Sequence, residues 1–188
     1  MEKFSNLKSK KILICITGGI AVYKIASLVN HFLKNGSQVK VIMTQAATEF
    51  VSPVTFQALL NDVVYTDLFD IKNPREVEHI SLAKWADICL VAPATANTIG
   101  KIAHGIADNL LTTVVMALPQ KTKIIIVPAM NTEMWNNPIM KNNINELKKY
   151  KRYIFINPVS GLLACRDEGI GKVADSQDIL KIVSKELK

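Results

Sequence analysis

The sequence lacks several features that would assign its 188 residues to a class at once. Its three cysteines, Cys15, Cys89 and Cys165, form no CxxC pair, which argues against a disulfide framework and for a reducing compartment. No apolar run reaches the roughly 18 residues of a membrane span, and the basic N-terminus has no separate apolar segment before a cleavage site. We therefore predict a cytoplasmic protein with no membrane partner.

A nucleic-acid platform is also missing, although the net charge is +7. Aromatic residues make up 6% of the chain, and none interleave with the lysine clusters as a single-stranded nucleic-acid site requires. The clusters lie near the start, at 148–152, and near the end. They indicate a solvated basic surface and no nucleic-acid partner, and a mild attraction for anionic substrates stays open.

The composition is that of one globular domain. Apolar residues make up 49% and charged residues 21%. No internal repeat, low-complexity segment or linker divides the chain. We predict a single domain over residues 1–188, with its core from about residue 10 onward.

Short apolar runs of strand length alternate with helical patterns. The predicted strands are 11–17, 38–44, 87–93, 122–128 and 153–158, and the predicted helices are 22–33, 55–60, 97–104, 109–118, 138–150 and a C-terminal helix with Ser176 as its N-cap. Residues 61–78 are expected to be mostly irregular. This alternation predicts an α/β fold, a Rossmann-like three-layer sandwich whose mostly parallel sheet has helices on both faces.

In such sheets ligands bind beyond the carboxyl ends of the strands. After the first strand, Gly18, Gly19 and Ile20 open a helix and form a phosphate loop, although not a full GxGxxG. The second strand ends at Thr44 rather than at the acid that an NAD site uses for ribose, which favours a mononucleotide. A tight turn with no ligand remains the alternative.

Two further strand ends carry polar and small residues. The third leads into PATANT (93–98), which admits a flat ligand, although Thr95 or Asn97 would serve equally as a helix N-cap. The fourth leads into PAMNTEMWNNP (128–138), predicted as an irregular turn, where Asn131 alone could satisfy turn backbone groups. His79 and Cys165 also stand in polar segments. Taken singly, each has a structural explanation.

Taken in order, these motifs closely resemble the flavin-dependent cysteine decarboxylases. The matching stretches are Gly18-Gly19-Ile20, HISL (79–82), PATANT (93–98), PAMNTEMW (128–135) and LACRDEGIG (163–171). PAMNxxMW is highly specific for that family, and PATANT is a close variant of its PxSANT. The resemblance covers about residue 10 to the C-terminus, and the ligase domain fused to some members is expected to be absent here.

The resemblance implies an FMN-dependent carboxy-lyase. Its expected reaction is the decarboxylation of 4′-phosphopantothenoylcysteine to 4′-phosphopantetheine and CO2 in coenzyme A biosynthesis. Bound FMN would oxidise the carbon that carries sulfur, so that the neighbouring carboxylate can leave, and would then return the hydride. Trimers in the family imply a homotrimer or a multiple of trimers, with FMN and substrate held between subunits. A separate phosphopantothenate–cysteine ligase is an expected partner.

The resemblance also implies residue roles. His79 is the expected base, Asn131 holds the substrate carboxylate, and Cys165 is the final proton donor. Leu162, Leu163 and Ala164 would close as a flap over the substrate. The expected FMN contacts are Gly18, Gly19, Ile20, Thr44, Ala94, Thr95, Ala96, Asn97, Ala129 and Met130. Met130, Met134 and Trp135 would form an apolar wall, or Met134 and Trp135 would be ordinary core. No metal site is predicted.

Two alternatives and two departures stay open. Decarboxylases of a peptide C-terminal cysteine lack the flap cysteine, and flavin-binding regulatory relatives lose the His or the Asn, whereas all three are present here. The usual flap, ACGDxGxGR, is altered by Arg166 and Lys172. Arg166 costs backbone freedom if its position needs a positive φ, or else it meets the substrate phosphate.

Overall fold

The main sheet has six parallel strands in the order β3-β2-β1-β4-β5-β6. It is seen in a computed structural model that describes residues 4–69 and 78–188. The strands are β1 (Lys11–Ile16), β2 (Gln38–Met43), β3 (Val64–Tyr65), β4 (Ile88–Ala94), β5 (Lys123–Pro128) and β6 (Tyr153–Phe155). This order is that of a Rossmann sheet, so the predicted fold class is confirmed, and the strand order reverses between β1 and β4.

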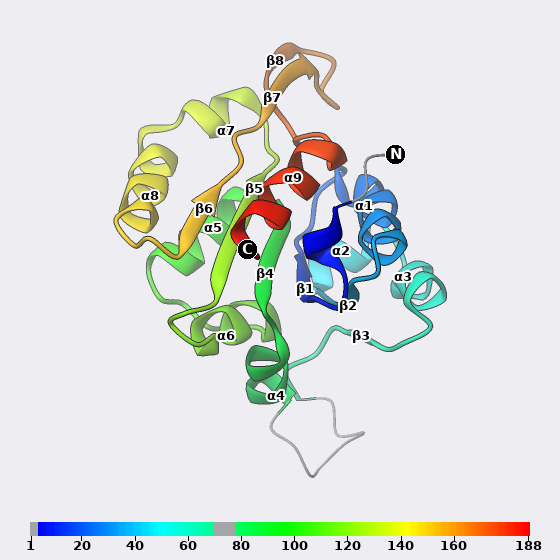
Figure 1. The fold of residues 1–188 in the computed structure, drawn as a ribbon. Helices are drawn as coiled ribbons and strands as arrows, with labels where there is room; N and C mark the ends of the chain where they lie inside the picture. The colour runs from blue at the N-terminus through cyan, green and yellow to red at the C-terminus, as the bar shows by residue number, and fades with distance from the viewer. Residues whose placement is uncertain (1–3, 70–77) are drawn as a thin grey trace.

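The strands are apolar throughout because both faces of the sheet are covered. Alternate side chains of β1 enter two separate cores: Ile12 and Ile14 the first, Leu13 and Cys15 the second. The first core is completed by α1 (Val22–Lys34), α3 (Pro53–Leu60) and α9 (Ser176–Glu186). The second is completed by α4 (Glu78–Trp85), α5 (Ala96–Ala103), α6 (Leu110–Ala117), α7 (Thr132–Asn136) and α8 (Pro138–Lys148) (Figure 1).

Cys15 and Cys89 are fully buried in the second core, with their sulfur atoms 3.8 Å apart on adjacent strands. The hydrogen bond between them, together with burial, raises the pKa of the Cys15 thiol. It therefore stays protonated, and the prediction that both residues are small core hydrophobes is confirmed.

Several predicted boundaries need correction. Asp175 rather than Ser176 occupies the N-cap position of α9, and Ser176 is the first helical residue. The stretch predicted as irregular contains β3, which pairs with β2, while residues 70–77 of that stretch lie outside the described residues. The turn after Pro128 is not wholly irregular, because α7 forms directly after Asn131. Short elements η1 (Ser5–Leu7) and α2 (Gln45–Thr48) were also not predicted.

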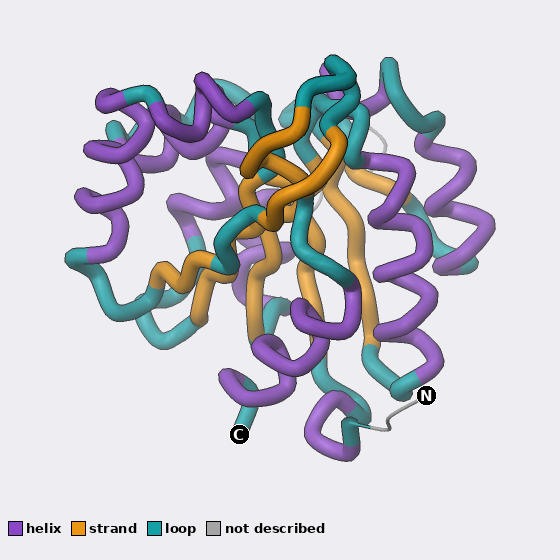
Figure 2. The backbone as a smooth tube through the Cα atoms, turned by 90° about the horizontal axis from the view of Figure 1, so that it is seen from above, coloured by secondary structure: helices purple, strands orange, loops and turns teal. Residues whose placement is uncertain are grey.

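A second, two-stranded antiparallel sheet pairs β7 (Val159–Leu162) with β8 (Glu168–Lys172). This hairpin rises at the top of Figure 1 and passes in front of the main strands in Figure 2. It holds the stretch that was expected to act as a flap. The hairpin was not predicted because its sequence lacks the alternation of apolar and polar residues that is typical of strands. Three of its nine strand residues are glycines: Gly161, Gly169 and Gly171.

Within residues 4–69 and 78–188, no helix has both the length and the apolar character that a membrane crossing needs.

Candidate functional site

A cavity of about 630 Å³ opens at the carboxyl ends of β1, β4 and β5. Four segments line it: the start of α1, the end of β4, the turn before α7, and the β7–β8 hairpin with the residue after it. Their lining positions are 18–21, 23–24, 93, 95–96, 129–131, 134, 162–165 and 171–173. The cavity thus lies at the reversal of strand order, where ligands of such sheets bind.

Thr17 joins the two strand ends that border the cavity. Its buried hydroxyl donates to the Pro93 carbonyl at 2.6 Å and accepts from the Thr95 amide at 2.9 Å. Beyond it, the backbone N–H groups of 18–21 donate no hydrogen bond to any described residue. They lie at the positive end of α1, so this loop can bind an anion.

The two glycines of the loop are required for different reasons. A Cβ on Gly18 would lie 2.5 Å from the Cβ of Ala46, so Gly18 permits close packing of α2. A Cβ on Gly19 would have only the Thr95 Cγ2 within 4 Å, at 3.9 Å, so a side chain there would occupy open space beside the cavity. Gly18 is therefore needed by the fold, and Gly19 keeps the cavity wide.

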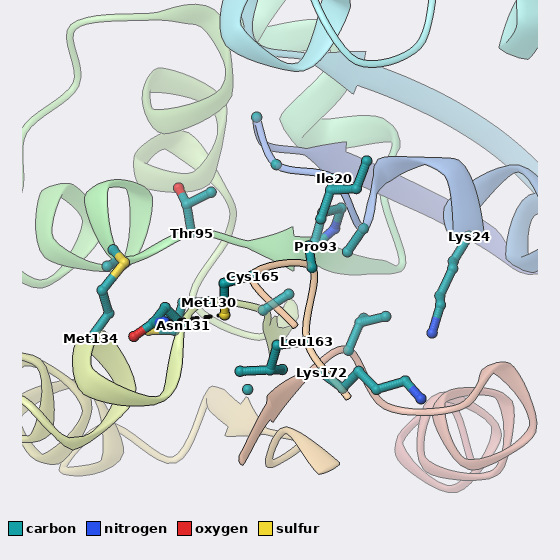
Figure 3. Close-up of a pocket in the computed structure, with 18 of the residues that line it drawn as sticks. Ile20, Lys24, Pro93, Thr95, Met130, Asn131, Met134, Leu163, Cys165 and Lys172 are labelled. Atoms are coloured by element: carbon teal, nitrogen blue, oxygen red, sulfur yellow. Dashed lines mark hydrogen bonds between the residues drawn. The ribbon is translucent and has the colours of Figure 1, made fainter. Parts of the chain in front are cut away.

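Both the oxygen and the nitrogen of the Asn131 carboxamide form hydrogen bonds. Its Oδ1 accepts from the Glu133 amide at 2.7 Å and caps α7, while its Nδ2 donates to the Cys165 sulfur at 3.6 Å (Figure 3). Because the oxygen is held by the backbone, the NH2 group is the part presented to the cavity. Asn131 thus offers a hydrogen-bond donor beside a thiol.

The hairpin is held against the turn before α7 by close backbone packing. The Met130 amide donates to the Gly171 carbonyl at 3.0 Å. A Cβ on Gly171 would collide with the Met130 carbonyl oxygen, and one on Gly169 with the Thr132 side chain. The glycines of the LACRDEGIG stretch therefore bring Cys165 next to Asn131.

The structure brings most of the predicted site residues together around this one cavity. Those that line it are Gly18, Gly19, Ile20, Thr95, Ala96, Ala129, Met130, Asn131, Leu162, Leu163, Ala164 and Cys165. The alternative role given to Thr95 also holds, because its Oγ1 accepts from the Thr98 amide and caps α5. One residue serves both purposes.

Three predicted FMN contacts do not line the cavity. The Thr44 hydroxyl instead accepts from the Ala47 amide at 3.2 Å and caps α2. Ala94 is fully buried, and its carbonyl accepts from the Ala129 amide at 3.1 Å. Asn97 is exposed in the first turn of α5. The Ala94 side chain enters the second core although its neighbours Pro93 and Thr95 both line the cavity.

His79 also lies outside the cavity of its own chain. It sits in the first turn of α4, which packs on α6 through Leu82 and Ala83. In Figure 1 α4 lies at the lower end of the molecule, and the hairpin that carries Cys165 lies at the upper end. Within one chain, therefore, Asn131 and Cys165 share the cavity and His79 does not, while the role expected for His79 stays a prediction.

The Met and Trp residues of the 128–138 stretch divide between site and core. Met130 and Met134 line the cavity, whereas Trp135 is 8% exposed and belongs to the second core. The Lys141 ammonium lies 4.0 Å from the centre of the Trp135 ring. The apolar wall thus has two members, and Trp135 is ordinary core.

Arg166 has a φ of 69°, in the left-handed region. Its amide donates to the Leu163 carbonyl at 2.9 Å and closes the hairpin turn. The conditional prediction that it costs backbone freedom therefore holds. Arg166 is exposed and does not line the cavity, so the alternative role at the substrate phosphate finds no support.

The sequence interpretation missed Tyr23, Lys24 and Val173, which line the cavity. Lys24 carried a signal that could have been used. It stands in the first turn of α1, where the helix dipole favours acids and opposes a cation. Lys172, noted only as a departure from the flap pattern, lines the cavity as well.

Comparisons of the sequence and of the fold relate the chain to known proteins. The model of the Flavoprotein family matches residues 1–188. The chain is 47% identical over 179 residues to the coenzyme A biosynthesis bifunctional protein CoaBC of Bacillus subtilis (strain 168), covering 95% of the chain and 43% of that protein. It is 45% identical over 179 residues to a probable phosphopantothenoylcysteine decarboxylase of Streptococcus mutans, covering 95% of the chain and 99% of that protein.

Solved structures have the same fold. A PPC decarboxylase mutant complexed with pantothenoylaminoethenethiol superposes with a TM-score of 0.81 at 30% identity, covering 94% of this chain and 97% of that one. The FMN-dependent cysteine decarboxylase SpaF gives 0.82 at 27% identity, covering 96% and 98%. The bifunctional relative is more than twice as long as the stretch it shares with this chain, because the match spans 43% of it.

Proposed function

The chain belongs to the Flavoprotein family, and on that premise we propose that it is an FMN-dependent phosphopantothenoylcysteine decarboxylase. This carboxy-lyase converts 4′-phosphopantothenoylcysteine to 4′-phosphopantetheine and CO2 in coenzyme A biosynthesis. The single observation that carries the proposal is the Asn131 Nδ2–Cys165 Sγ contact inside the strand-end cavity. A cytoplasmic location stays a prediction from the sequence.

The residues of the cavity fit FMN. The unpaired amides of 18–21 suit its phosphate, and the open space beside Gly19 leaves room for it. Thr95, Ala96, Ala129 and Met130 supply the small and apolar surface that a flat ring requires. When bound, FMN supplies the reversible hydride chemistry that makes loss of the carboxyl group possible.

Asn131 and Cys165 act on the substrate itself. The Asn131 NH2 group donates to the substrate carboxylate and fixes its orientation, because the carboxamide oxygen is already engaged by the Glu133 amide. The Cys165 thiol, beside that NH2 group, gives its proton to the substrate carbon at the end of the reaction. Leu162 and Leu163 in the hairpin exclude water from the cavity.

A second copy of the chain completes the site in this proposal. The separation of α4 from the hairpin supports a base supplied by another subunit, with His79 of one copy facing Asn131 and Cys165 of the next. A homotrimer, or a multiple of trimers, provides such contacts around a ring. A phosphopantothenate–cysteine ligase is the proposed supplier of substrate, as the bifunctional relatives suggest.

The test is a visible spectrum of the purified protein, followed by measurement of CO2 released from phosphopantothenoylcysteine. We expect bound oxidised flavin and CO2 release with phosphopantetheine as product. Asn131→Asp should lower the rate at least about a hundredfold, because it removes a donor and adds a negative charge near the carboxylate. Asp also caps helices well, so α7 should still form.

Asn137→Asp is the matched control. Asn137 caps α8 through the Ile139 amide at 2.9 Å and does not line the cavity, so the same chemical change there should leave the rate unchanged. A colourless protein that releases no CO2 would contradict the proposal. Release of an enethiol from a peptide C-terminal cysteine would favour the peptide-tailoring alternative.

A further inference from the structure

Two lysines from different elements share one end of the cavity. Lys24 comes from the first turn of α1, and Lys172 is the last residue of β8. Figure 3 shows both ammonium groups on the same side of the view, away from Asn131 and Met134. Among the described residues that line the cavity they are the only charged side chains. This end is therefore positively charged, with no carboxylate on its walls.

Neither lysine has a partner within the described part of the chain. Elsewhere, lysines do pair: Lys101 with Asp108 and Lys149 with Glu146, each at 2.6 Å. Lys24 is half-buried yet forms no ion pair or hydrogen bond with any described residue. Lys172 is exposed, and it too forms no ion pair or hydrogen bond with any described residue, so both charges are available to a ligand.

The helix end adds to the positive potential around Lys24. Lys24 faces the positive end of the α1 dipole, and the first turn contains no acid to offset it. Asp175 lines an adjoining cavity of about 290 Å³ together with Lys24 and Val173. Asp175 forms no ion pair with Lys24, so the charge at this end is not neutralised.

Lys172 reaches the same end along the hairpin. Its side chain crosses Gly161 of β7, where a Cβ would lie 3.3 Å from the Lys172 Cδ and 3.4 Å from its Nζ. Gly161 also has a φ of 152°, which other residues rarely adopt. A glycine at this position thus leaves the path of the Lys172 stem open, and an amphipathic stem of this kind can carry its charge to the cavity mouth.

We propose that Lys24 and Lys172 form a phosphate-monoester site that binds the 4′-phosphate of the substrate. The inference rests on the proposed function, which puts the cysteine end of the substrate at Asn131 and Cys165. The phosphate is at the other end of that molecule, and the two lysines lie away from Asn131 in Figure 3. The site makes phosphorylation of the substrate a requirement for tight binding.

The test uses two ligands that differ only in the phosphate. Binding of 4′-phosphopantetheine and of pantetheine to the FMN-loaded protein is measured by calorimetry. We expect a preference of about a hundredfold for the phosphorylated ligand, about tenfold from each charge-assisted contact. Lys24→Gln and Lys172→Gln should each lower the preference about tenfold without changing pantetheine affinity, and the double variant should abolish it.

Lys24→Arg should keep most of the preference, because it keeps the charge. Lys34→Gln is the matched control: Lys34 is exposed at the end of the same helix, outside the cavity, and its change should have no effect. An equal loss of affinity for both ligands would overturn the site, because the lysines would then only pack. A fall in FMN content with the preference intact would also overturn it and assign Lys24 to the flavin phosphate.

The two proposals fail separately. If the protein releases no CO2 but prefers the phosphorylated ligand, the proposed function falls and the phosphate site stands. If it releases CO2 and binds both ligands equally, the phosphate site falls and the proposed function stands.

Discussion

At Asn131 one carboxamide serves the fold and the cavity together. Its oxygen caps α7, and its NH2 group contacts Cys165. The backbone amide of Glu133 therefore fixes which half of the side chain meets a ligand. This explains why an Asn suits the position better than an Asp, whose second oxygen would offer no donor.

Arg166 provides a prediction at the same scale. Its left-handed φ of 69° costs about 1–2 kcal/mol, and about half of this is offset by the greater freedom that Gly has when unfolded. Arg166→Gly should therefore raise the free energy of unfolding by about 0.5–1 kcal/mol. Equilibrium unfolding in urea measures this change in the free energy of unfolding.

Arg166→Ala separates the backbone from the charge, because it removes the guanidinium and keeps the Cβ. We expect no stabilisation from it. If Ala and Gly stabilise equally, the strain is not the cause.

At the scale of elements, the β7–β8 hairpin depends on close packing against the turn before α7. Gly171 is the tightest point, since an added Cβ would collide with the Met130 carbonyl. Gly171→Ala should push the hairpin away and break the Met130–Gly171 hydrogen bond of 3.0 Å. Activity should fall about a hundredfold, as expected when a catalytic group is displaced by about 1 Å. Steady-state kinetics measures the loss of activity, and far-UV circular dichroism shows whether the rest of the fold is kept.

Gly100→Ala is the control for that change. A Cβ on Gly100 in α5 would meet only the Asn143 amide nitrogen, at 3.5 Å, which is ordinary contact. It should leave activity intact and add about 0.5–1 kcal/mol of stability as a helix-interior alanine. Equal losses of activity in both variants would mean that the close packing at Gly171 is not the cause.

The elements also show how far sequence patterns reach. The long buried strands and amphipathic helices were predicted correctly, because their periodicity is local and strong. The hairpin and α7 were missed, because a five-residue helix and glycine-rich strands have no such period. Thr44 shows a further limit of sequence patterns, because a phosphate-binding hydroxyl and a helix cap have the same residue type at the same strand end; the cap is observed, and the contact with FMN stays a prediction.

At the scale of the whole molecule, the position of His79 is the least predictable feature. The resemblance gave His79, Asn131 and Cys165 roles in one reaction, yet α4 and the hairpin lie at opposite ends in Figure 1. No local pattern encodes such a separation. The proposed oligomer resolves it, because another copy can supply His79.

Mixing variants tests that oligomer. His79→Asn and Asn131→Asp should each be inactive alone. Mixed oligomers formed by co-expression should recover roughly a quarter of wild-type activity if neighbours pair at random, because some cavities then have both native residues. Asn131→Asp mixed with Cys165→Ser should form no phosphopantetheine, since both residues face one cavity of one chain. If neither mixture recovers activity, His79 does not act across subunits.

The most direct measurement is the mass of the product that Cys165→Ser makes from phosphopantothenoylcysteine. Cys165 is exposed at the hairpin turn, so the substitution should leave the fold and the cavity intact. We predict CO2 release and an enethiol that is two hydrogens short of phosphopantetheine, because the last proton is not delivered. Phosphopantetheine formed by this variant at the wild-type rate would contradict the account.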